Sequence, residues 1–125
     1  MTWRPICLQD AHRPQLAAHW AALPDDERAR LFGRAMPAAE LPDYADCIDF
    51  SVEPVFAVLH PVLDIIAAVH CRRLDRRIEA AVSVAPLARY QGLEMLLMQR
   101  AISHAYDCGA GVLAFRGSAP AEGFL

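Results

Sequence analysis

The segment from Ile78 to Leu97 combines a short apolar run, a proline, a glycine-containing loop and an amphipathic helix pattern. A loop that enters a helix presents unpaired backbone amides and the positive end of the helix dipole, an arrangement that suits the pyrophosphate of a nucleotide cofactor. Gly92 would let the backbone of this loop approach a ligand closely. The residue types and their spacing therefore predict an anion-binding loop where the helix begins.

Candidate acid–base groups lie on the strand pair that is predicted to precede this loop. A two-residue turn at 75–76 would place Arg72 opposite Glu79, and would bring His70 and Ser83 to the same face of the sheet. A histidine titrates near neutral pH, and a carboxylate can take a proton from a substrate. Glu79 has an equally simple structural role, because it would form a salt bridge with Arg72 across the hairpin.

The cysteines offer neither a zinc motif nor a redox motif. No two of them are separated by two residues, so we expect four free thiols and no metal site: Cys7, Cys47, Cys71 and Cys108. Cys71 follows His70 on a predicted strand, so its side chain would point to the opposite face as a buried thiol. The sequence places no base for Ser83, which is therefore not expected to act as a nucleophile.

Caps and apolar periodicity predict helices in the first half of the chain. A short strand is expected over 2–7, followed by a helix that has Asp10 as its N-cap. Two further helices are expected over 24–33 and 37–48, the first with acids in its first turn and a glycine at its end.

The spacing of the apolar residues changes after residue 55. Short, branched apolar runs predict three consecutive strands over 55–59, 65–69 and 78–84. An amphipathic helix over 92–107 and a strand over 111–116 follow. Strand, helix and strand at this spacing imply a right-handed parallel crossover, so the sheet is expected to be mixed.

The run from Ile78 to Leu97 resembles the acetyl-CoA-binding core of the GNAT superfamily of N-acetyltransferases. In that family a fourth strand ends in Val-x-Pro, here Val84 to Pro86, and a loop with Arg or Gln leads to a glycine that opens a long helix. The likeness covers residues 2 to about 116. It implies an α+β (α/β) fold with a mixed, largely antiparallel sheet and a β-α-β acetyl-CoA-binding core.

The resemblance also implies roles for individual residues. In the family the pantetheine arm inserts between the fourth and fifth strands and bonds to the fourth strand as an extra strand would. The backbone amide of Val84 is the expected donor to the thioester carbonyl. Glu79 matches a frequent general base, and His70 is the second candidate. The expected cofactor-binding residues are Val82, Ser83, Val84, Arg89, Tyr90, Gln91, Gly92, Leu93 and Glu94.

Two features depart from the family pattern. Glu94 stands where the family has Gly or Ala. Either it stabilises its helix, or it occupies the amides and repels the pyrophosphate unless Arg89 draws it aside. The family also continues with another helix, which often carries a tyrosine acting as an acid, and with two more strands. We expect 117–125 to be a tail, so that the fold lacks those last elements.

Composition bounds the remaining alternatives. The chain has 125 residues, 55% of them hydrophobic and 22% charged, which predicts a single domain over 1–125. Its expected parts are 2–48, 55–84, 86–116 and 117–125. All twelve basic residues are arginine, as is typical of a GC-rich coding sequence. They are spread along the chain and outnumbered by fifteen acids, so a nucleic-acid partner is not expected.

The apolar stretches are shorter than the roughly 18 residues of a membrane span, and the first ten residues contain no signal-peptide core. We therefore expect a cytoplasmic protein that has no membrane partner. The resemblance implies acetyl-CoA as co-substrate and an unidentified small-molecule or peptide amine as acceptor. The alternative is an inactive GNAT-fold regulatory or CoA-binding module, completed by homodimerisation at the open edge of its last strand.

Overall fold

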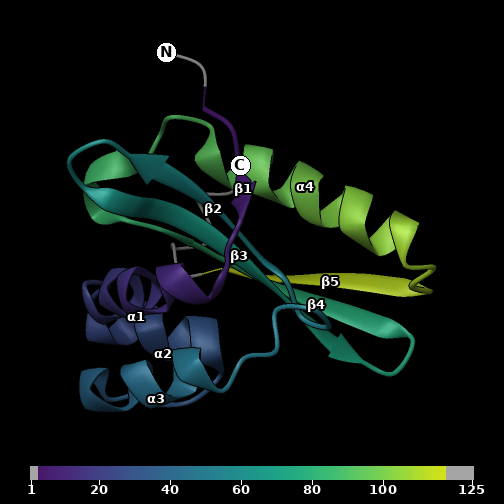
Figure 1. The fold of residues 1–125 in the computed structure, drawn as a ribbon, viewed down its shortest axis with the longest axis horizontal. Helices are drawn as coiled ribbons and strands as arrows, with labels where there is room; N and C mark the ends of the chain where they lie inside the picture. Colours follow the sequence, from purple (N-terminus) through teal and green to yellow (C-terminus); the bar gives the residue numbers. More distant parts are fainter. Residues whose placement is uncertain (1–2, 118–125) are drawn as a thin grey trace.

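The computed structural model describes residues 3–117 and contains one five-stranded sheet with helices on both faces (Figure 1). The strands lie side by side in sequence order: β1 (Ile6–Cys7), β2 (Val55–His60), β3 (Asp64–Leu74), β4 (Arg77–Val84) and β5 (Val112–Gly117). Neighbours are antiparallel except β4 and β5, which are parallel. The predicted mixed, largely antiparallel α+β fold is confirmed.

The helices form two layers. Figure 1 shows the three N-terminal helices below the sheet and the long helix α4 above it. The helices are α1 (Arg13–Ala21), α2 (Asp25–Phe32), α3 (Leu41–Asp46) and α4 (Leu93–Asp107), and the short 3-10 turns are η1 (Asp10–His12), η2 (Ala38–Glu40) and η3 (Pro86–Ala88). No helix within residues 3–117 is long and apolar enough to cross a membrane.

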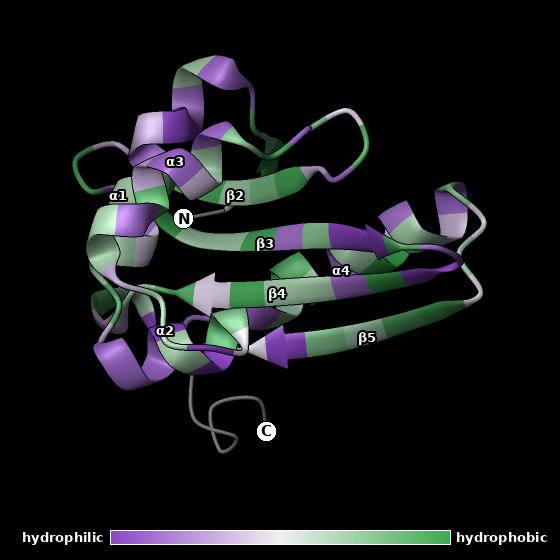
Figure 2. Cartoon of the chain, turned by 90° about the horizontal axis from the view of Figure 1, so that it is seen from below, coloured by the Kyte–Doolittle hydropathy of each residue, from purple (hydrophilic) through white to green (hydrophobic). Residues whose placement is uncertain are grey.

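Side chains alternate between the two faces of each strand, so the hydrophobic core is divided between these two layers. Ala68 and Ala81 pack with Trp20 on the α1–α3 side, whereas Val69 and Val82 pack on the α4 side. Figure 2 shows β3 as hydrophobic where helices cover it and hydrophilic toward the β3–β4 hairpin. This pattern orients every polar side chain of the candidate site, because only alternate residues of β3 and β4 face α1.

The hairpin register is confirmed. Arg72 lies opposite Glu79 and His70 opposite Ala81, as the two-residue turn predicts. Asp75, the first residue of that turn, has a φ of 61°, in the region that such hairpin turns require.

Three details of the N-terminal half differ from the prediction. Asp10 is not the N-cap of the first helix. It begins the turn η1, where the His12 ring accepts a hydrogen bond from the Gln9 amide, and α1 starts at Arg13. The first strand is only Ile6–Cys7, since Pro5 has no amide proton for a ladder bond; Thr2 lies outside the described residues.

The helix predicted over 37–48 is divided into η2 and α3. Pro42 favours a new helix start, because its ring nitrogen cannot donate to a preceding turn. The buried stripe is nevertheless as expected, with Leu41 and Ala45 fully covered.

Strand β5 pairs only with β4 within residues 3–117, so its other edge is unpaired there. Such an edge is a template for pairing with a second chain. We therefore expect a homodimer, which light scattering at micromolar concentration would detect. The tail, 118–125, lies outside the described residues. A monodisperse monomer that aggregates only after removal of 118–125 would contradict the dimer and indicate that the tail covers the edge.

Candidate functional site

Within residues 3–117, strand β4 extends beyond its pairing with β5 at its carboxyl end. Pairing with β5 ends at Val82 and Gly117 within the described residues. The Ala85 amide donates to the Ile66 carbonyl at 2.8 Å on the β3 side. Because backbone groups alternate between the two edges of a strand, the amide and carbonyl of Val84 face the β5 side, beyond the last β4–β5 pair within residues 3–117.

The three residues expected to bind the pantetheine arm therefore differ in the neighbouring strand that their backbone groups face. Val84 has no strand partner on the β5 side within residues 3–117, Val82 is paired with β5, and Ser83 is paired with Ala68 of β3. Among the described residues, the backbone of Val84 is the part of this strand without a β5 partner, and it could bind an extended ligand as an added strand would bind.

The loop after β4 leads into an uncapped helix. Gly92 is the N-cap of α4, with a φ of 77° that favours glycine, and no side chain caps the helix. At this end of the helix, the Leu96 amide donates a hydrogen bond to the Gly92 carbonyl at 3.1 Å. A Cβ built at Gly92 would meet no atom within 4 Å. The expected open helix N-terminus is thus present.

Glu79 is buried among guanidinium groups on the α1–α3 side of the sheet. Its carboxylate lies 3.2 Å from Arg116, 3.6 Å from Arg72 and 3.9 Å from Arg77. The salt bridge to Arg72 was expected, whereas the contact from Arg116 on β5 was not. Arg116 also packs over Gly33, where an added Cβ would lie 2.6 Å from its guanidinium.

His70 shares this face but is buried. Its Nε2 lies 3.4 Å from a Glu53 carboxylate oxygen, and its ring centroid lies 6.2 Å from that of Trp20. Burial lowers the pKa of His70 to about 4, although Glu53 acts in the opposite direction. The expectation that His70 titrates near neutrality is therefore wrong. Cys71 is a buried thiol, as predicted, and burial raises its pKa to about 12.

Solved structures have a similar fold. An N-acetyltransferase from Staphylococcus aureus Mu50 superimposes with a TM-score of 0.70 at 17% identity, over 92% of this chain and 73% of its own. The yncA protein of Salmonella typhimurium, solved with its cofactor acetyl-CoA, gives 0.66 at 16% identity, over 92% and 69%. A GNAT-family acetyltransferase from Colwellia psychrerythraea gives 0.68 at 19% identity, over 94% of this chain.

The chain has the GNAT fold.

It spans 40% of the length of the Colwellia protein. No family sequence model and no curated protein matches it.

Arg89, expected to bind phosphate in the GNAT loop, is directed to α2 instead. Its guanidinium forms an ion pair with Glu27, and both side chains are largely buried. The hypothesis that Arg89 draws Glu94 aside is therefore wrong. In the sequence, Glu27 is one of three acids in a first helical turn, and its burial depends on how α2 packs against β4.

Glu94 lies in the first turn of α4, as predicted, and is half-buried. No basic side chain within residues 3–117 forms an ion pair with it. Its negative charge therefore remains unneutralised beside the helix amides that would hold a phosphate in a GNAT enzyme.

His19 was missed by sequence analysis. Its Nε2 lies 2.8 Å from the Ser83 hydroxyl, and burial lowers its pKa to about 4. The statement that no base is placed for Ser83 is therefore wrong. Ser83 has an exposed fraction of 0%, however, so an electrophile cannot reach its hydroxyl. The burial of His19 could have been predicted from its position, because it lies on the same buried stripe of α1 as Leu16 and Trp20.

Proposed function

We propose that the chain is an acetyl-CoA-dependent N-acetyltransferase that transfers acetyl to the amine of a small molecule or peptide. The observation that carries this proposal is that, within residues 3–117, the end of β4 at Val84 has no β5 partner and the loop after it leads to the uncapped start of α4 at Gly92. Acetyl-CoA supplies an activated thioester. The structural neighbour that was solved with acetyl-CoA supports this choice of co-substrate.

The backbone performs most of the binding in this proposal. The Val84 amide donates to a carbonyl of the extended pantetheine or thioester. The amides from Tyr90 to Leu93 face the pyrophosphate, and the helix dipole favours its charge. The absence of a Cβ at Gly92 keeps this approach free.

Glu79 is proposed as the group that takes the ammonium proton of the acceptor, directly or through a water. His70 is a weaker candidate, because burial disfavours its protonated form. The three arginines fix the position of the Glu79 carboxylate and occupy part of its accepting capacity. Because these arginines compete with a substrate proton for the carboxylate, they favour the alternative function, a CoA-binding module without catalysis.

Calorimetry with acetyl-CoA and acetyl-pantetheine tests the binding step. Acetyl-CoA should bind measurably, and acetyl-pantetheine much more weakly, because it lacks the pyrophosphate that faces α4. Equal affinities would show that the helix N-terminus does not contribute, and no binding of either would overturn the proposal. Amine-dependent release of the CoA thiol then separates an enzyme from a module that only binds.

Replacing Glu94 with Gln should tighten acetyl-CoA binding about fivefold, because the change removes one unneutralised negative charge near the pyrophosphate, worth on the order of 1 kcal/mol after screening. Glutamine is used because glycine would also weaken the first turn of α4. Asp107→Asn, the same charge change at the other end of α4, is the control and should leave the affinity unchanged. Weaker binding by the Gln variant, measured by calorimetry, would refute the repulsion.

A further inference from the structure

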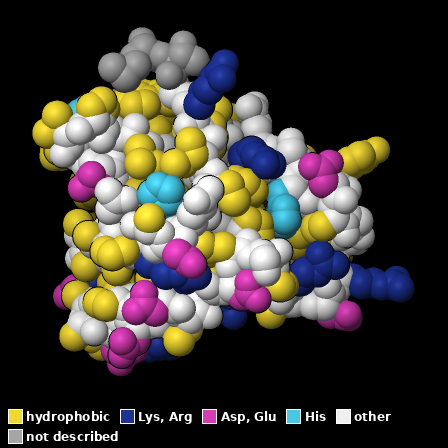
Figure 3. Space-filling view, viewed as in Figure 1, with side chains coloured by type: hydrophobic (Ala, Val, Ile, Leu, Met, Phe, Trp, Pro, Cys, Tyr) yellow, Lys and Arg dark blue, Asp and Glu magenta, His cyan; other side chains and the backbone are white. Residues whose placement is uncertain are grey.

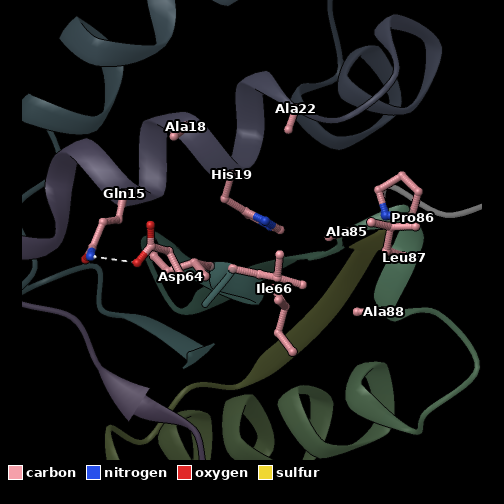
Figure 4. Close-up of a pocket in the computed structure, with 12 residues that line it drawn as sticks. Gln15, Ala18, His19, Ala22, Asp64, Ile66, Ala85, Pro86, Leu87 and Ala88 are labelled. Carbon is pink, nitrogen blue, oxygen red and sulfur yellow. Dashed lines mark hydrogen bonds between the residues drawn. The ribbon is translucent and has the colours of Figure 1, made fainter. Parts of the chain in front are cut away.

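A pocket of about 390 Å³ lies between α1, the start of β3 and the turn η3 (Figure 4). It is on the β3 side of β4, whereas the backbone of Val84, which has no β5 partner within residues 3–117, faces the β5 side. In Figure 4, His19 points into it from α1, Ile66 borders it from β3, and Ala88 borders it from η3. The volume falls in the range of small-molecule sites, roughly 300–1,000 Å³.

The pocket exists because small side chains line it. Ala18 on α1 and Ala22, the C-cap of that helix, face Ala85 and Ala88 across the space, so no large side chain fills it. Nine of the twelve lining residues are apolar. At the rim, two exposed leucines from different loops, Leu63 and Leu87, extend the apolar surface toward solvent. A ligand for this pocket therefore needs a compact apolar group.

The pocket carries one charge. Asp64 is its only acidic residue, and no arginine lines it. The Asp64 carboxylate accepts one hydrogen bond, from the neutral Gln15 amide at 3.4 Å, and forms no ion pair within residues 3–117. His19, the remaining polar residue, already contacts Ser83 and is neutral at pH 7, since burial lowers its pKa to about 4.

An unneutralised carboxylate beside an apolar space matches a cation that has an apolar body. An anion would be repelled by Asp64 and would find no cationic side chain in the lining. We propose that this pocket binds a small molecule in which a compact apolar group is joined to an ammonium group. The apolar group lies between α1 and η3, and the ammonium pairs with Asp64.

On the face shown in Figure 3, several acidic side chains lie close to arginine side chains, whereas Asp64 in the pocket forms no ion pair within residues 3–117. This inference goes beyond the proposed function. The pocket and the backbone edge of Val84 lie on opposite sides of β4, so the pocket is expected to bind its ligand without acetyl-CoA.

Amide chemical shifts measured during titration of the full chain test the proposal, with cyclohexylmethylamine as the probe and no acetyl-CoA. Cyclohexylmethanol and cyclohexanecarboxylate have the same apolar group without the positive charge. The amine should bind about tenfold more tightly than the alcohol, because its ammonium makes a charge-assisted hydrogen bond. The carboxylate should bind more weakly still. The shifted amides should cluster in α1, 63–66 and 85–88.

Variants separate the two parts of the site. Asp64→Asn should reduce the preference for the amine over the alcohol to near unity, whereas Ala18→Leu should fill the pocket and abolish binding of both. Asp75→Asn is the matched control, because Asp75 is also exposed with a φ near 60° but lies at the opposite end of β3. It should bind as the unmodified chain does.

Equal affinity for amine and alcohol in the unmodified chain, or shifts clustered elsewhere, would overturn the proposal. So would a preference for the amine that Asp64→Asn leaves intact. A parallel titration with acetyl-CoA, followed at Val84 and the start of α4, tests the proposed function separately. Failure of one site is therefore distinguishable from failure of the other.

Discussion

Lowering the pH from 7 to 4 should remove several kcal/mol of the free energy of unfolding, because His19 and His70 are buried in their neutral forms. Burial lowers the pKa of each from 6.5 to about 4. Between those values the unfolded chain binds more protons than the folded chain, so stability rises with pH and falls on acidification. The expected loss is on the order of 2–3 kcal/mol for each histidine.

The surroundings of the two rings differ. Backbone hydrogen bonds with Ile65 and Ser83 favour protonated His19, but they are outweighed by its burial. Glu53 favours protonated His70, and Arg72 opposes it. Since His70 has a carboxylate beside it, we expect the smaller of the two contributions from His70.

Urea unfolding at pH 7, 6, 5 and 4 measures this dependence. His19→Gln and His70→Gln should each reduce the slope of stability against pH in this interval, and the double variant should reduce it most. His12→Gln, at a half-exposed ring in η1, is the control and should retain the slope. If the free energy of unfolding does not change between pH 6.5 and 4.5, His19 and His70 are not buried in their neutral forms as proposed.

The features predicted correctly are local. The β3–β4 register follows from alternation and a two-residue turn, both of which are visible within a short segment around Asp75. The end of α2 follows from Gly33 in the same way, and its φ of 71° is the left-handed value expected there.

The features that were missed join residues from distant segments. His19 meets Ser83 across 64 positions, and Arg89 meets Glu27 across 62. Periodicity identifies which face of a helix or strand is buried, but it does not determine how two elements cross. The contact that buries His70 against Trp20 is of this kind, so its pKa could not be inferred from its position on β3.

Glu79→Gln should lower amine-dependent turnover about 100-fold at neutral pH, because a general base of this kind contributes about 10² or more to the rate. The difference in turnover between the variant and the unmodified chain should become smaller as the pH rises, since amines then lose their proton without a base. Kinetics measured across this pH range distinguish a base from a purely structural residue, for which the deficit would not depend on pH.

The same substitution should also cost on the order of 1–3 kcal/mol of stability, because Arg72, Arg77 and Arg116 lose the carboxylate that they share, although solvent screens these half-exposed groups. Turnover must therefore be expressed per folded molecule, with urea unfolding as the reference. Cys71→Ala is the control, because Cys71 packs on the α4 side and its change should leave turnover nearly intact. Loss of activity in the Cys71 variant together with retention in the Glu79 variant would exclude Glu79 as the base, and the arginine cluster would then have a structural role alone.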